Sequence, residues 1–284
     1  MAIFTNQATL SYNNTTTNSN VAVGELVEVL SITKTAVSDD YSAGENVTYV
    51  ISIVNSGAAA FSALTLTDDL GGYTFGTDTL YPLSYVDGSI RYYINGALQP
   101  SPVVTAGPPL TVSGISVPAG GNATIVYETA VTQYAPLATG DTVTNTATLA
   151  GGGISTPPSA SETITTAATS NLTITKSICP QTVTENSRVT YTFVIQNTGN
   201  TEVIATDNAV VTDTFNPILT DLAVSFDGTA WTSPVNYTYD EVTGAFATVA
   251  GEITVPAATY AQDAVTGAWV VTPGVATLTV TGTI

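Results

Sequence analysis

The stretch Val47-Thr-Tyr-Val-Ile-Ser-Ile-Val-Asn55 decides the fold, because apolar residues recur at every second position, as in a β-strand with one buried face. It returns in the second half of the chain as Val189-Thr-Tyr-Thr-Phe-Val-Ile-Gln-Asn197. Clusters of Gly, Pro, Asn and Asp separate many other short strands of this kind. The sequence therefore predicts an all-β protein made of two tandem antiparallel β-sandwiches.

Composition narrows the classes of function. The 284 residues include 22 acidic and four basic side chains, a net charge of −18, which argues against nucleic acid and anionic membranes as partners. With no histidine and a single cysteine, Cys179, the chain lacks the means for transition-metal sites and histidine-based catalysis. We expect no cofactor, no metal and no membrane insertion, since no apolar run is long enough to span a bilayer.

The chain contains two lysines, and they occupy matched places in the two repeats. Lys34 lies in Leu-Ser-Ile-Thr-Lys34-Thr and Lys176 in Leu-Thr-Ile-Thr-Lys176-Ser. Each lysine precedes its Val-Thr-Tyr run by the same spacing. Because the chain has so few lysines and yet has one at the same place in each repeat, we expect the two amines to take part in a chemical reaction.

The two repeats differ at their ends. The first contains Thr144-Asn-Thr-Ala-Thr-Leu149 and a return strand near 161–165, whereas the second stops after the counterpart of 123–127. A matching hairpin, beginning with Thr5-Asn-Gln-Ala-Thr-Leu10, lies instead at the N-terminus. We predict three parts: an N-terminal donor hairpin over 1–28, a complete sandwich over 29–170, and a sandwich over 171–284 that lacks its final hairpin.

A sandwich without its last strands exposes an apolar cleft and an unpaired strand edge. A second copy of the chain could fill the cleft by β-strand addition, and repetition of this head-to-tail contact builds a filament. The alternative is that the hairpin folds back onto its own second repeat and closes a monomer.

Strand alternation aims three polar side chains of each repeat toward its core. In the first repeat they are Lys34, Asp68 and Asn145. In the second they are Lys176 and Asp213, with Asn6 of the N-terminal hairpin in the third place. The alternative explanation is a buried Lys–Asp ion pair, or lysines that extend their charge to solvent.

Burial of polar groups is costly, and an isopeptide bond would explain it. A buried amine is held neutral and becomes a nucleophile, and a buried carboxyl shuttles protons. The lysine amine attacks the asparagine amide carbon and ammonia leaves. Asp68 and Asp213 are the expected catalytic groups, in a single-turnover reaction rather than an enzyme activity.

The motifs together resemble the prokaryotic surface repeat known as domain of unknown function 11. They are Thr-Lys-Thr/Ser, Val-Thr-Tyr running to Asn-x-Gly, Val/Leu-Thr-Asp and Thr-Asn-x-Ala-Thr-Leu. The resemblance covers 29–170 fully and 171–284 without the last hairpin. It implies an Ig-like domain similar to pilin and adhesin domains with Lys–Asn isopeptide bonds, here Lys34–Asn145 within a chain and Lys176–Asn6 between chains.

We therefore expect a pilus-like structural protein that binds copies of itself on a cell or spore surface. We expect it to reach that surface without a conventional signal peptide, because Met1-Ala-Ile-Phe-Thr-Asn6 has no basic or long apolar segment. A monomeric adhesion or spacer module is the alternative function. A calcium-stabilised module is less favoured, because the acidic pairs Asp39-Asp40 and Asp68-Asp69, and Asp207 with Asp213, lack the spacing of a calcium loop.

Overall fold

The computed structural model describes residues 2–284 and is built from β-strands, with one 3-10 helix at Ala205–Asp207. This confirms the all-β prediction. The described chain forms two compact units. The first contains 2–39, 45–132 and 144–164, and the second contains 40–44, 133–143 and 165–284.

The N-terminal residues form a long antiparallel hairpin. β1 (Ala2–Asn6) pairs with β4 (Ala22–Leu26), and β2 (Thr9–Tyr12) pairs with β3 (Thr15–Asn18). Two asparagines, Asn13 and Asn14, turn the chain in the left-handed conformation that asparagine tolerates. All side chains from 3 to 23 are exposed, so the apolar face of the hairpin is left uncovered.

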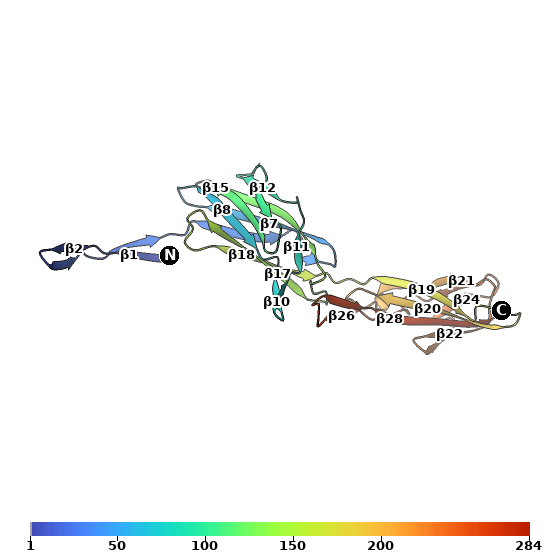
Figure 1. Cartoon of the computed structure of the whole chain (residues 1–284). Coiled ribbons are helices and arrows are strands. Elements are labelled where there is room, and N and C mark those ends of the chain that lie inside the picture. Colours follow the sequence, from blue (N-terminus) through green and yellow to red (C-terminus); the bar gives the residue numbers. More distant parts are fainter. Residues whose placement is uncertain (1) are drawn as a thin grey trace. The chain divides into compact units, whose positions relative to one another are not determined.

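The first sandwich packs two six-stranded sheets face to face (Figure 1). One sheet has the order β13-β12-β16-β7-β5, with β11 also paired to β16. Its strands are β5 (Leu30–Ala36), β7 (Asn46–Asn55), β11 (Leu83–Tyr85), β12 (Arg91–Ile94), β13 (Ala97–Leu98) and β16 (Asn122–Val131).

The other sheet has the order β14-β15-β8-β17-β18-β6. Its strands are β6 (Asp40–Tyr41), β8 (Phe61–Asp68), β14 (Val103–Thr105), β15 (Leu110–Val117), β17 (Thr142–Gly151) and β18 (Ser159–Thr166). A separate small hairpin joins β9 (Tyr73–Phe75) to β10 (Asp78–Leu80).

The second sandwich has one sheet of five strands and one of three. The larger sheet, in the order β19-β20-β28-β22-β23, contains β19 (Leu172–Cys179), β20 (Arg188–Asn197), β22 (Thr220–Phe226), β23 (Thr229–Trp231) and β28 (Gly274–Thr283). The smaller, in the order β21-β25-β24, contains β21 (Thr212–Thr214), β24 (Tyr237–Asp240) and β25 (Ala245–Thr248). β26 (Thr259–Gln262) and β27 (Trp269–Thr272) form another hairpin.

Strand register shows which elements correspond. Tyr49 on β7 lies opposite Tyr127 on β16, and its repeat partner Tyr191 on β20 lies opposite Val280 on β28. The β5-β7-β16 core of the first sandwich therefore corresponds to β19-β20-β28 of the second.

The sheet that contains β8 in the first sandwich matches the sheet that contains β21 in the second only in part. Asp68 of β8 lies opposite Leu110 of β15 on one side and opposite Ala147 of β17 on the other. Asp213 of β21 lies opposite Phe246 of β25, and in the described part of the chain β21 pairs with no other strand. The second sandwich thus ends at β21, where the first continues with β17, β18 and β6.

The missing strands change the exposure of matched apolar residues. Ile32 on β5 is 9% exposed, whereas its counterpart Ile174 on β19 is 52% exposed. Beside Ile174 an apolar cleft opens between the larger sheet of the second sandwich and the segments that precede β21 and follow β25. Its lining residues are Leu172, Thr173, Ile174, Ile195, Ala209, Val210, Val211 and Ile253.

A buried asparagine stabilises the same turn in both sandwiches. Asn55 donates from Nδ2 to the carbonyl oxygens of Ala59 and Pro118, at 2.8 and 2.9 Å, and its Oδ1 accepts from the Gly57 amide at 2.9 Å. Asn197 makes the equivalent bonds to Thr201, Pro256 and Gly199. The Asn-x-Gly motif is therefore a structural staple that joins neighbouring loops.

Candidate functional site

The first candidate site lies in the core of the first sandwich, where Lys34 and Asp68 meet. The two side chains are fully buried, and Lys34 Nζ lies 2.6 Å from Asp68 Oδ2. Lys34 comes from β5 and Asp68 from β8, so the ion pair bridges the two sheets. The lysine ammonium also lies 4.7 Å from the centre of the Tyr49 ring.

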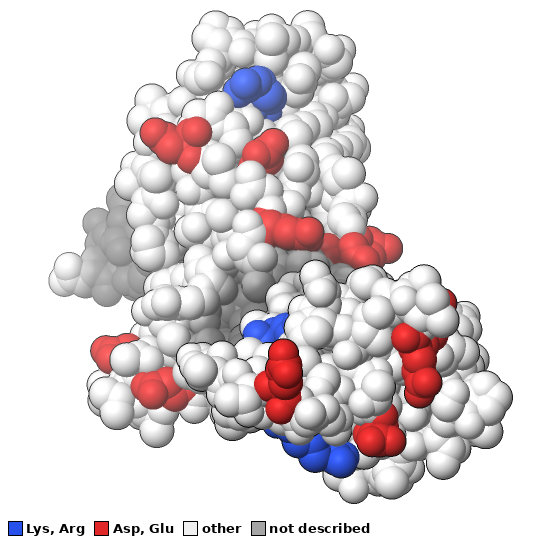
Figure 2. Space-filling model, turned by 90° about the vertical axis from the view of Figure 1, so that its right-hand side faces the viewer, with Lys and Arg blue, Asp and Glu red and all other residues white. Residues whose placement is uncertain are grey.

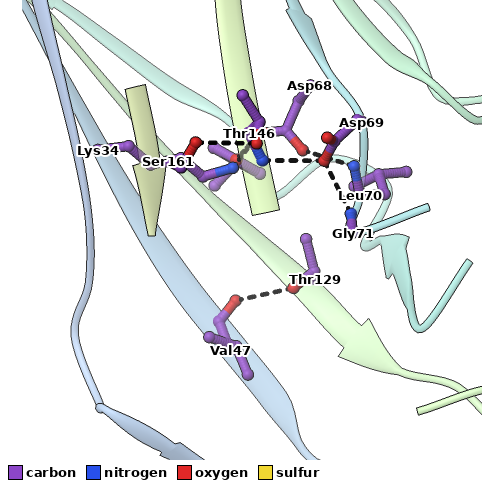
Figure 3. Close-up of polar contacts among 10 residues, drawn as sticks. Lys34, Val47, Asp68, Asp69, Leu70, Gly71, Thr129, Thr146 and Ser161 are labelled. Carbon is purple, nitrogen blue, oxygen red and sulfur yellow. Dashed lines mark hydrogen bonds and ion pairs between the residues drawn. The ribbon is translucent and has the colours of Figure 1, made fainter. Parts of the chain in front are cut away.

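Asp68 is held from several directions (Figure 3). Its Oδ1 accepts a hydrogen bond from the Leu70 amide at 3.0 Å. Tyr127 donates its hydroxyl proton to Oδ2. The adjacent Asp69 accepts from the amides of Gly71 and Thr146, which ties the end of β8 to β17. The carboxyl group that faces Lys34 is thus fixed in place.

The third residue predicted for this site, Asn145, lies on β17. Its side chain is buried, and in the described part of the chain neither Nδ2 nor Oδ1 has a hydrogen-bond partner. The Tyr49 hydroxyl is likewise buried without a partner. Asn145 lies near enough to Tyr49 and Tyr127 to influence the pKa of both hydroxyls. An unpaired buried carboxamide is unusual and needs an explanation.

Burial sets the protonation of this cluster. Desolvation lowers the pKa of Lys34 from its ordinary value, against the opposing effect of Asp68, and so favours the neutral amine. Burial also raises the pKa of Tyr49 and Tyr127, the second further because the Asp68 charge is close. Both phenols therefore keep their protons at neutral pH.

The second candidate site has the same lysine and aspartate in a more open setting. Lys176 and Asp213 form an ion pair, but 39% of the Lys176 side chain is exposed. The ammonium lies 4.6 Å from the ring centre of Tyr191 and about 5.3–5.4 Å from those of Phe193 and Phe215. Sequence alternation predicts that Lys176 faces the core, and the structure leaves this part of the core uncovered.

The third residue predicted for the second site lies in another part of the chain. Asn6 is on the N-terminal hairpin, opposite Ala22 of β4, and its side chain is exposed. The structure therefore brings together Lys34, Asp68 and Asn145 in one core, and Lys176 with Asp213 in the other. It does not place Asn6 in the cluster around Lys176.

The tyrosines are members of the first site that sequence reasoning missed. Tyr49 and Tyr127 share the inward phase of their strands, and their rings stack with centres 5.7 Å apart. The signal was available, since Tyr49 is repeated as Tyr191, but an inward tyrosine is also an ordinary core residue.

Figure 2 shows acidic side chains at several places on this face of the surface, with fewer basic ones. Within residues 2–284, no group of three or more acidic, histidine or cysteine side chains is arranged to hold a metal ion. Among the described residues, no helix has the length and apolar character needed to cross a bilayer.

Comparison with known proteins gives distant likenesses. No protein-family model and no curated protein matches the chain, so its membership of domain of unknown function 11 stays a prediction. Among solved structures, the chain is similar to BcpA, the major pilin subunit of Bacillus cereus, with 13% identity over 96% of this chain and 73% of that one, and a TM-score of 0.36.

A second similar structure is the pilus backbone protein RrgB of Streptococcus pneumoniae, with 11% identity over 86% of this chain and 55% of that one, and a TM-score of 0.34. The N-terminal domain of the Streptococcus gordonii adhesin Sgo0707 has 14% identity over 52% and 34% of the two chains, and a TM-score of 0.36. Similarities this low carry no argument about function. The argument about function therefore depends on the two candidate sites.

Proposed function

We propose that this chain is a structural subunit of an extracellular fibre that assembles head to tail. The N-terminal hairpin of one copy enters the second sandwich of the next, in the place that β17 and β18 occupy in the first sandwich. The observation that carries the proposal is the end of the smaller sheet at β21, beside an apolar cleft, in a chain whose N-terminal hairpin is exposed.

The hairpin has the residues that this position requires. In β17 the buried side chains are Val143, Asn145, Ala147 and Leu149. The matching phase of the hairpin carries Phe4, Asn6, Ala8 and Leu10. Strand addition would pair the free edge of β21 and bury the apolar cleft, two gains that favour association of copies.

Two isopeptide bonds form in this proposal, and the one between copies makes the fibre covalent. Lys34 reacts with Asn145 inside the first sandwich, with Asp68 as proton carrier. Lys176 of one copy reacts with Asn6 of another, with Asp213 in the same role. The reaction occurs once per site, so the chain is a self-modifying structural protein rather than an enzyme.

The test is electrophoresis of the assembled protein after boiling in detergent. Wild type should give a ladder of multiples, and Asn6→Ala should give monomer only. Asn18→Ala is the matched control, because Asn18 is another exposed asparagine of the same hairpin, and it should keep the ladder. A ladder that persists in Asn6→Ala would overturn the intermolecular bond.

Intact mass separates the alternatives. A monomer that has lost two ammonia molecules would mean that the hairpin closes on its own second sandwich. A monomer that has lost one would support a spacer or adhesion module with only the Lys34–Asn145 bond. A chain that has lost none would overturn both bonds.

A further inference from the structure

The Tyr49 hydroxyl is a buried hydrogen-bond donor that the packing of the core does not require. Its ring is fully buried against the Tyr127 ring, and its oxygen has no partner in the described part of the chain. A phenylalanine would fill the same space without leaving a polar group unpaired. The hydroxyl therefore needs a role outside the resting structure.

The other unpaired atoms of this core belong to Asn145. Its Oδ1 and Nδ2 are both buried without partners, and the carboxamide influences the Tyr49 hydroxyl directly. Asn145 comes from the sheet that contains β8 and β17, whereas Tyr49 comes from β7 of the facing sheet. A donor and an acceptor thus lie unsatisfied near each other in one core.

We propose that Tyr49 is a catalytic residue of the bond-forming step, donating its hydroxyl proton in a hydrogen bond to Oδ1 of Asn145 as negative charge develops there. This inference rests on the proposed Lys34–Asn145 bond. Preorganised donors aimed at a developing oxyanion are among the strongest sources of catalysis, especially in a buried site.

The atoms of the step balance as follows. Lys34 passes one proton to Asp68, and its neutral Nζ attacks Cγ of Asn145, so that the Cγ–Oδ1 electron pair moves onto Oδ1. Asp68 then protonates Nδ2 and takes up the second proton from Nζ. The electron pair returns from Oδ1 to re-form the carbonyl as the Cγ–Nδ2 bond breaks. Ammonia leaves, and Lys34 and Asn145 are joined by an amide.

Tyr49 is the donor that remains available at this moment. Tyr127 already donates to Asp68 Oδ2, and the Thr146 amide that follows Asn145 donates to Asp69. Burial keeps Tyr49 protonated, because it raises the pKa of the hydroxyl. The neutral hydroxyl can therefore donate throughout the reaction.

The second sandwich has a tyrosine at the position of Tyr49 but none at the position of Tyr127. Tyr191 repeats Tyr49, whereas Val280 stands in the place of Tyr127. Tyr191 lies beside Lys176, with its ring centre 4.6 Å from the amine. The same reasoning therefore assigns Tyr191 as the donor to Oδ1 of Asn6 from another copy.

The experiment follows ammonia loss by intact mass during a pulse of cell-free synthesis of the full chain. Tyr49→Phe should slow the loss assigned to Lys34–Asn145 by about 100-fold, the usual effect of removing one oxyanion donor. Tyr92→Phe is the matched control, because Tyr92 is also buried but bonds to the Ser116 backbone away from the site, and it should react at the wild-type rate.

An unchanged rate in Tyr49→Phe would overturn the assignment. Unfolding by denaturant in an Asn145→Ala background, with and without Tyr49→Phe, shows whether the fold survives the substitution. A slow reaction with an equal loss of folded protein would give Tyr49 a packing role only and overturn the proposal. If wild type itself loses no ammonia, the isopeptide bond has failed, a result distinct from either.

Discussion

Lys34 and Lys176 occupy the same register position in their sandwiches but lie in different surroundings. Lys34 is opposite Ile51 on β7, and Lys176 is opposite Phe193 on β20, where Ile51 and Phe193 are themselves matched positions of the repeat. The Lys34 side chain is fully buried and that of Lys176 is 39% exposed. The difference follows from β17 and β18 of the first sandwich, which have no counterpart in the second sandwich among residues 2–284.

The bond within the first sandwich should make it much more stable. Lys34 and Asn145 lie far apart in the sequence, so a bond between them restricts the unfolded chain as a long-loop disulfide does. Asn145→Ala should lower the free energy of unfolding by about 4–5 kcal/mol, measured by chemical denaturation. Asn122→Ala, at an exposed strand position, should leave it nearly unchanged.

The free amine of Lys34 should make stability depend on pH. Burial lowers the pKa of Lys34 in the folded chain below the ordinary 10.5, although Asp68 opposes this shift. At pH values between the folded pKa and 10.5, the unfolded chain therefore binds more protons than the folded chain. In an Asn145→Ala background, stability should therefore rise with pH across that window.

The control for this pH dependence is Lys34→Met in the same Asn145→Ala background. Tyr49 and Tyr127 are present in both proteins, so their own ionisation cancels in the comparison. The difference in unfolding free energy between the two proteins should grow in favour of the lysine form as pH rises. A difference that stays constant with pH would contradict the lowered pKa.

A charge placed in the open cleft should block assembly and spare the fold. Ile174 lies 52% exposed on β19, whereas its counterpart Ile32 is 9% exposed on β5. Ile174→Asp should abolish the detergent-resistant ladder with little change in unfolding, because its side chain remains near water in the free subunit. Ile32→Asp should strongly destabilise the first sandwich. Equal destabilisation by the two would argue against an open second cleft.

The one glycine of the hairpin, Gly24, lies against an aromatic side chain. A Cβ at Gly24 would collide with the Phe4 ring, which covers this position. Gly24→Ala should displace the ring and reduce fibre formation, measured by light scattering, while denaturation of the sandwiches stays as in wild type. Val23→Ala, on the opposite face of β4, should assemble normally.

The buried staples should matter for stability in both sandwiches. Asn55→Ala leaves the Ala59 and Pro118 carbonyls and the Gly57 amide without their partner, which should cost about 1–3 kcal/mol or more in unfolding free energy. Asn197→Ala should have a similar effect in the second sandwich. Neither should prevent ammonia loss in chains that fold, because neither asparagine takes part in the proposed reaction.

Much of the fold could be predicted from the sequence, because its signals are local. Alternation in Val47–Asn55 predicts a strand with one buried face, and the observed β7 has that pattern. The repeat identifies β19 and β20 as counterparts of β5 and β7. Alternation also places Lys34 and Asp68 on facing inward positions, and the structure joins them.

The rest depends on tertiary contacts that no local pattern records. Alternation gives Lys176 the same inward phase as Lys34, but whether that side is covered depends on strands distant in sequence. The unpaired hydroxyl of Tyr49 is likewise invisible in sequence, because an inward tyrosine usually finds a partner. The staple role of Asn55 needs two loops distant in sequence, 55–59 and the one at Pro118, to meet.

The burial of Lys34 has a further consequence for the finished material. Lysines are the amines that fixatives, acylating reagents and many surface-modifying enzymes attack, and this chain has only two of them. The first is sealed in a core, and on our proposal the second is consumed when a neighbour docks. A mature fibre would then keep a reactive lysine amine only in the end subunit whose second sandwich is empty, so reagents that label Lys176 of the free subunit would find no such lysine along the rest of the fibre.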